Sequence, residues 1–175
     1  RSGATRLART VAWCGTGAFV AISANQANLL DLRPGRALKA GAVHVPGLLA
    51  AGGPAAAVGG AVLGAGGAVA PADLAGRDML GDAGANALGA VLAVGVAAAA
   101  PPAVRWALLA AEAGLTVASE KISFTRVIES TPVLRQIDAW GRTAAPAAEP
   151  ATGPVAGPVA EPLTGPVTAQ EAHPA

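Results

Sequence analysis

The 175-residue chain carries 12 Lys and Arg against 11 Asp and Glu, and 53% of its residues are hydrophobic. Charged residues make up 13% of the sequence, well below the roughly 25% typical of soluble domains. A net charge of +1, 3% aromatic residues and no dense basic run argue against nucleic-acid binding. One cysteine, Cys14, excludes an intrachain disulfide, and His44 and His173 form no metal-ligand pattern with it.

Charged residues are segregated along the chain. Apart from Arg105 and Glu112, they fall outside residues 10–30, 41–72 and 83–118. Because hydrocarbon offers the backbone no hydrogen-bonding partner, apolar stretches of this length are expected to be helices. The sequence therefore predicts an all-α, polytopic transmembrane helical bundle of about five spans, some of them short.

The first predicted span covers residues 10–27, and a signal peptide cleaved near Ser23 is the alternative. Residues 41–72 are too many for one span and too few for two full ones. We predict a tight hairpin here rather than one long tilted helix, which would put the flanking charged loops on opposite sides. The turn of this hairpin is Gly52-Gly53-Pro54, and its two arms are residues 40–52 and residues 55–71.

A second hairpin is predicted from residues 83–100 and 104–119, because Pro101 and Pro102 interrupt the apolar sequence between them. The loops that join the hairpins hold most of the basic residues, whereas the two hairpin turns hold none. The positive-inside rule then predicts a plasma-membrane protein whose charged loops are cytoplasmic. These loops lie near residues 28–39, 73–82 and 119–142.

The last part of the chain changes character twice. Residues 124–142 are polar and predict an amphipathic helix after Pro132, lying on the membrane surface. Residues 143–175 are rich in Ala, Pro and Gly and repeat Gly-Pro-Val, which is typical of disorder. We therefore expect a transmembrane helical domain over residues 1–142 and a disordered tail over residues 143–175.

Two acidic motifs lie where apolar stretches meet charged loops. The first ends in Asp31 and is followed by Leu32-Arg33-Pro34-Gly35-Arg36, a turn that places a carboxylate near two guanidinium groups. Arg grips phosphate through two hydrogen bonds, and an Asp oxygen is a hard ligand for Mg²⁺. This loop is therefore predicted to bind phosphate and Mg²⁺, and an ordinary positively charged membrane anchor is the alternative.

The second acidic motif precedes an apolar helix. Asp82 is placed to cap free backbone amides there, and Gly81 and Gly84 allow close backbone approach. The start of a helix also attracts anions, which favours a diphosphate at this point. A plain N-cap aspartate explains Asp82 equally well.

The two motifs in order, Asn25-x-x-Asn28-Leu29-Leu30-Asp31 and Met79-Leu80-Gly81-Asp82-Ala83-Gly84-Ala85-Asn86, resemble those of the polyprenyl-phosphate N-acetylhexosamine-1-phosphate transferases. This superfamily includes phospho-N-acetylmuramoyl-pentapeptide transferase. The resemblance implies a membrane enzyme of cell-wall biogenesis. Such an enzyme transfers a sugar 1-phosphate from a UDP-sugar to polyprenyl phosphate and releases UMP.

The resemblance implies Mg²⁺ as cofactor, with Asp31 and Asp82 as the catalytic and metal-binding residues. The partners it implies are a UDP-sugar, a polyprenyl phosphate lipid and the bilayer. A second copy of the chain, forming a homodimer, is a further candidate partner. The remaining residues expected to bind substrate come from the two motifs and from the loop after the last span. They are Asn25, Asn28, Arg33, Arg36, Gly84, Asn86, Lys121 and Arg126.

The chain departs from this family in lacking an adjacent Asp-Asp pair, which the family carries on an earlier loop. It also lacks the histidine-rich loop, whose place is taken by residues 119–126. Because the Asp-Asp pair is missing and the chain begins at Arg1 rather than Met, we expect the carboxy-terminal part of a longer enzyme, inactive alone. The rival hypotheses are a degenerate, non-catalytic membrane protein that retains the scaffold, and a secreted Ala/Pro-rich protein.

Overall fold

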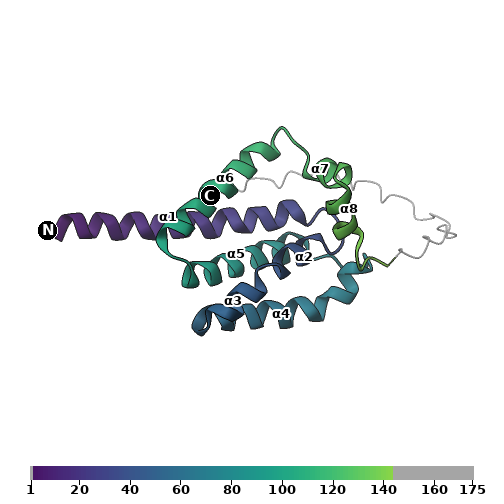
Figure 1. Cartoon of the computed structure of the whole chain (residues 1–175), viewed down its shortest axis with the longest axis horizontal. Helices are drawn as coiled ribbons and strands as arrows, with labels where there is room; N and C mark the ends of the chain where they lie inside the picture. The colour runs from purple at the N-terminus through teal and green to yellow at the C-terminus, as the bar shows by residue number, and fades with distance from the viewer. Residues whose placement is uncertain (1, 144–175) are drawn as a thin grey trace, which may run out of the picture. The chain divides into compact units, whose positions relative to one another are not determined.

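The computed structural model describes residues 2–143, and it describes side chains from residue 5 (Figure 1). Within this range the chain is helical between turns, which confirms the all-α prediction for these residues. The predicted disordered tail lies outside the described residues except for Thr143. The helices in chain order are α1 (Ser2–Leu30), α2 (Arg36–Ala42), α3 (Val45–Ala51), α4 (Gly53–Leu74), α5 (Gly81–Ala99), α6 (Pro102–Ser119), α7 (Phe124–Ser130) and α8 (Pro132–Ala139).

Three helices are long and apolar enough to cross a membrane, which indicates a membrane protein. They are Thr5–Leu30 within α1, Gly53–Leu74 and Gly81–Ala99. The first arm of the predicted hairpin differs from expectation, because it consists of α2 and α3, each of 7 residues. A helix of that length rises only about 10 Å, against the ~30 Å of a hydrocarbon core.

The predicted hairpin turn lies where the glycines allow it. Gly52 and Gly53 have φ angles of 73° and 52°, a region that favours glycine, and they reverse the chain between α3 and α4. Helix α3 packs against α4 and α5, and the buried core lies between these three helices. Its buried residues are Val45, Leu48, Ala55, Val62 and Leu92.

Helix α5 lies between α1 and α4 and packs against both (Figure 1). The approach to α1 is closest at Gly89, where an added Cβ would overlap with the backbone carbonyl oxygen of Ser23. Small residues let membrane helices approach in this way. Helix α6 packs on the other side of α1, so α1 joins α6 to the rest of the bundle.

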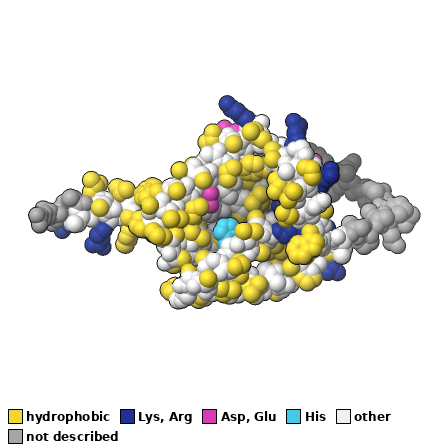
Figure 2. All heavy atoms as spheres, viewed as in Figure 1, with side chains coloured by type: hydrophobic (Ala, Val, Ile, Leu, Met, Phe, Trp, Pro, Cys, Tyr) yellow, Lys and Arg dark blue, Asp and Glu magenta, His cyan; other side chains and the backbone are white. Residues whose placement is uncertain are grey.

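The short helices α7 and α8 pack against each other near the carboxyl end of α1 (Figure 1). An amphipathic helix after Pro132 is confirmed as α8, in which Asp138 is buried and Ile137 is exposed. Figure 2 shows hydrophobic side chains over much of one face of the molecule, with basic side chains gathered mainly near α7 and α8.

Candidate functional site

Asp31 and Asp82 come from separate motifs and lie close together at one end of the bundle. Asp31 directly follows α1, and Asp82 lies in the first turn of α5. The backbone of Gly81 and the charge of Asp82 both act on the Asp31 carboxylate. The two carboxylates differ in exposure, because Asp31 is buried whereas Asp82 is open to solvent.

The environment of Asp31 disfavours its negative charge. Burial raises its pKa most, and repulsion from Asp73 raises it further, while the Gly81 hydrogen bond lowers it and Asp82 again raises it. Its Oδ1 atom is buried and has no hydrogen-bond partner among the described residues. A carboxylate in this state gains from any bound proton or cation.

The predicted N-cap role of Asp82 is wrong. Leu80 occupies the N-cap position of α5 without a side-chain hydrogen bond, and Asp82 lies inside the helix. The turn is instead made by Gly81, whose φ angle is 63°. Of the other predicted residues in this motif, Gly84 lies where an added Cβ would press on the side chain of Leu80, and Asn86 is exposed.

Both arginines of the predicted phosphate loop face carboxylates. Arg36 is only 5% exposed, and its Nε and Nη2 donate to the two oxygens of Asp138 at 2.8 and 3.2 Å. Its Nη1 also donates to the Thr125 hydroxyl at 3.1 Å. Arg33 pairs with Glu129 at the surface. In this structure the two guanidinium groups therefore attach the loop to α7 and α8.

Arg36, Lys39, Asp138 and Arg142 form a group that we call the docking cluster. Arg142 pairs with Asp138 at 2.8 Å, and Lys39 Nζ donates to the backbone carbonyl of Asp138 at 2.6 Å. The hydrogen bond from Arg36 is the main reason that the pKa of Asp138 is lowered, although burial opposes the shift. The cluster therefore holds an ionised carboxylate at the interface between α2 and α8.

The remaining predicted binding residues are open or half-open. Asn25, Lys121 and Arg126 are exposed, and Asn28 is half-buried. Arg126 lies three residues before Glu129 on α7, so it shares the side of that helix that meets Arg33. These side chains are available to a ligand approaching the same end of the bundle.

A polar network between α1 and α6 was not predicted from the sequence. Ser23 donates to Glu112 Oε2 at 2.7 Å, and Gln26 donates to the Glu112 backbone carbonyl at 2.8 Å and to the Thr116 hydroxyl at 2.9 Å. His44 and Glu112 both line an adjoining cavity of about 90 Å³. Two signals were available, the position of Gln26 inside the first motif and the isolated charge of Glu112 in an apolar stretch, and the network ties that motif to α6.

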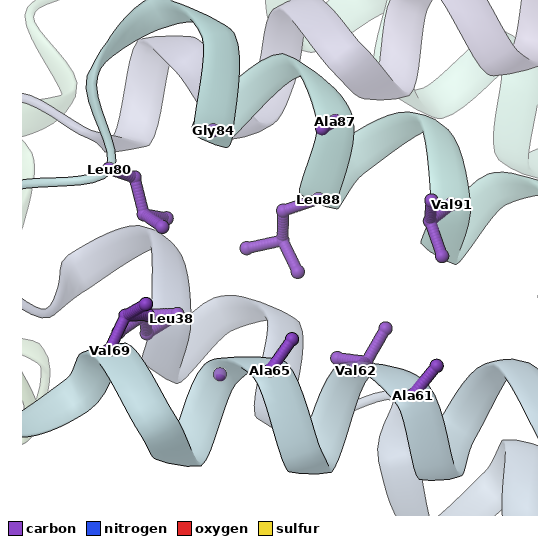
Figure 3. A pocket seen from close by; sticks show the side chains of 11 residues that line it. Leu38, Ala61, Val62, Ala65, Val69, Leu80, Gly84, Ala87, Leu88 and Val91 are labelled. Carbon is purple, nitrogen blue, oxygen red and sulfur yellow. The ribbon is translucent and has the colours of Figure 1, made fainter.

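An apolar pocket of about 290 Å³ lies between α4 and α5. Figure 3 shows Leu88 and Val91 of α5 directed toward α4, with Leu38 of α2 beside Val69. The pocket reaches Leu80 and Gly84, which flank Asp82 in the sequence. An apolar volume therefore begins next to the acidic motif and runs along two of the helices that could span a membrane.

Within the described part of the chain, no group of three or more His, Cys, Asp or Glu side chains is arranged to hold a metal ion. No protein-family model, no curated protein and no solved structure matches the chain. A function therefore has to be argued from the motifs and from the geometry around Asp31 and Asp82.

Proposed function

We propose that the chain is part of a membrane transferase that moves a sugar 1-phosphate from a UDP-sugar to a polyprenyl phosphate. The observation that carries the proposal is the proximity of Asp31 and Asp82, the two acids that the family resemblance selects. A phosphoryl transfer needs hard oxygen ligands and an aligned lipid phosphate at one aqueous edge. Two carboxylates fit that requirement, together with an apolar pocket that reaches the residues flanking Asp82.

The donor set at this edge suits Mg²⁺, which is usually held by one or two carboxylates together with substrate phosphates. The unpartnered Oδ1 of Asp31 and the exposed carboxylate of Asp82 are the oxygens that would hold it. When bound, Mg²⁺ neutralises charge on the transferring phosphate. Free amides in the first turn of the 19-residue α5 favour an anion beside Asp82.

The protein's own side chains would position the two substrates. Lys121 and Arg126 are exposed cations on the α6–α7 turn and on α7, where they can contact the diphosphate of the UDP-sugar. Part of the prenyl chain would occupy the apolar pocket between α4 and α5, because this pocket is lined by Leu80 and Gly84, which flank Asp82 in the sequence. That placement puts the lipid phosphate within reach of the acidic edge.

In the membrane arrangement we propose, α2 with α3 and α6 add two short crossings to the three long helices. The loops that carry Asp31, Asp82 and Lys121 then face the cytoplasm, since they hold most of the basic residues. An even number of crossings between Asp31 and Asp82 agrees with their position at one end of the bundle.

The test uses membranes from cells that express the chain from its natural gene. UMP release from UDP-N-acetylhexosamines is measured with undecaprenyl phosphate and Mg²⁺, and Asp31→Asn and Asp82→Asn are each expected to abolish it. Asp78→Asn, an exposed acid four residues before Asp82, is the matched control and should leave UMP release unchanged. Turnover that persists at the wild-type rate in both motif variants would refute the catalytic assignment.

A non-catalytic scaffold that binds lipid phosphate is the second candidate. The observation that favours it is the engagement of Arg33 and Arg36 with Glu129 and Asp138, because two arginines expected to bind the substrate of a transferase instead hold α7 and α8. This candidate predicts polyprenyl phosphate binding to the purified chain, no UMP release from wild-type membranes, and binding that survives Asp82→Asn.

A further inference from the structure

Asp73 is a buried acid that neither motif includes. It lies at the end of α4, and its side chain is 1% exposed. Its Oδ1 accepts a hydrogen bond from the backbone N–H of Gly35 at 2.8 Å. Its Oδ2 is buried without a partner among the described residues. One carboxylate oxygen of Asp73 thus accepts a hydrogen bond within the fold, and the other has no partner among the described residues.

Asp31 also has a buried carboxylate oxygen without a partner among the described residues, and it lies near Asp73. It is 9% exposed, its Oδ1 is buried without a partner, and it lies close enough to Asp73 for their charges to repel. Buried carboxylate oxygens are costly unless a hydrogen bond or a cation satisfies them. Two such oxygens from separate helix ends therefore mark a position that a cationic ligand would satisfy.

The nearby basic residues do not supply that ligand. None of the ion pairs between described residues includes Asp31, Asp73 or Asp82. Lys39 lies within electrostatic range of Asp73, but its ammonium group donates to two backbone carbonyls near the end of α8. The other two basic side chains of the docking cluster pair with Asp138, and they also donate to Thr125 and to the Pro34 carbonyl. Among the described residues, none of the three basic groups in the cluster forms an ion pair with Asp31 or Asp73.

We propose that Asp73 and Asp31 together bind a divalent cation, with Asp73 as a metal ligand. Two carboxylates suffice for Mg²⁺ or Mn²⁺, because the remaining positions are taken by water or phosphate oxygens. The charge of the exposed Asp82 also acts on Asp31 and adds to the negative potential near this pair. The role of the cation in phosphoryl transfer rests on the proposed function, whereas its binding does not.

The test measures Mn²⁺ binding to the purified chain in lipid nanodiscs, by the loss of the free Mn²⁺ electron paramagnetic resonance signal. The wild type is expected to bind Mn²⁺ in competition with Mg²⁺. Asp73→Asn should weaken binding at least about tenfold, the effect expected when a buried metal ligand or its support is removed. Asp78→Asn, the exposed control, should bind like the wild type.

Asp73→Asn keeps an oxygen that can accept from Gly35, so the variant is expected to fold. Should it fail to fold, paramagnetic broadening by Mn²⁺ in the wild type gives a second measurement. The backbone amides of Gly35 and Gly81, which contact the two carboxylates, should broaden first. Wild-type affinity in a folded Asp73→Asn variant, or broadening that spares both glycines, would overturn the proposal.

Failure of this inference and failure of the proposed function give different results. If Asp73→Asn loses Mn²⁺ while wild-type membranes release no UMP, the cation site stands and the transferase assignment falls. If Asp73→Asn retains Mn²⁺ while Asp82→Asn loses UMP release, the transferase stands and Asp73 is not a ligand.

Discussion

The guanidinium group of Arg36 is buried against the carboxylate of Asp138, 102 positions later in the chain, and donates to both of its oxygens. This pair fixes α8 against the start of α2, next to the loop that carries Asp31. A contact between an early and a late segment of the chain thereby stabilises the end of the bundle where Asp31 and Asp82 lie.

Replacing Arg36 by Met should destabilise the chain by about 3 kcal/mol, the lower end of the range for breaking a buried ion pair. The low end applies because Arg142 still pairs with Asp138. Unfolding in detergent micelles measures the loss. Arg33→Met is the control, since the Arg33–Glu129 pair is half-exposed, and it should cost less than about 1 kcal/mol.

The docking cluster should also make stability depend on pH. The folded pKa of Asp138 lies below its ordinary value of 3.8, so its contribution is complete above pH 3.8 and is lost as the pH falls through the folded value. Unfolding measured in acid should therefore show a loss that is absent in Asp138→Asn. An equal acid response in the variant would contradict this origin.

In contrast to Asp138, an ionised Asp31 should destabilise the folded chain. Its folded pKa lies above 3.8, so the folded chain binds this proton more tightly than the unfolded chain, and stability falls as the pH rises through this range. In buffer without divalent cations, Asp31→Asn is expected to raise the melting temperature at pH 7, and the gain should shrink as the pH approaches 3.8. A lower melting temperature at pH 7 would show that Asp31 stabilises the fold.

Much of the fold could be predicted because it depends on local patterns. Long uncharged stretches indicated helices, and the Gly52-Gly53-Pro54 sequence located the turn between α3 and α4. The division of residues 36–51 into two short helices was missed, although Pro46 in the first turn of α3 is the kind of residue that interrupts a helix. Hydropathy alone does not mark such an interruption.

The candidate site was only partly predictable. Asp31 and Asp82 were selected because acids at the ends of apolar stretches are unusual, and the structure places them together. The partners of Arg36 could not be predicted, since pairing with Asp138 depends on how the chain returns from α6. Asp73 carried no motif, and only its burial and its unsatisfied oxygen distinguish it from an ordinary loop acid.

Gly89→Ala should disturb the contact between α1 and α5. The added methyl group would overlap with the backbone carbonyl of Ser23, which cannot rotate away as a side chain could. Overpacking of this kind costs about 1–3 kcal/mol. Gly64→Ala in α4 is the matched control, because a Cβ there meets open space, and it should be neutral or stabilising. Equal unfolding of the two variants would argue against this packing.

Helix α8 should rest on the lipid interface through its apolar side, because its buried Asp138 faces the protein. Ile137 is 52% exposed and Trp140 is 77% exposed, and tryptophan favours the boundary between water and hydrocarbon. In vesicles, a variant with Trp13→Phe and Trp106→Phe reports on Trp140 alone. We expect its fluorescence to be quenched most by lipids brominated near the headgroup. Quenching by aqueous iodide with no effect of brominated lipid would place α8 away from the membrane.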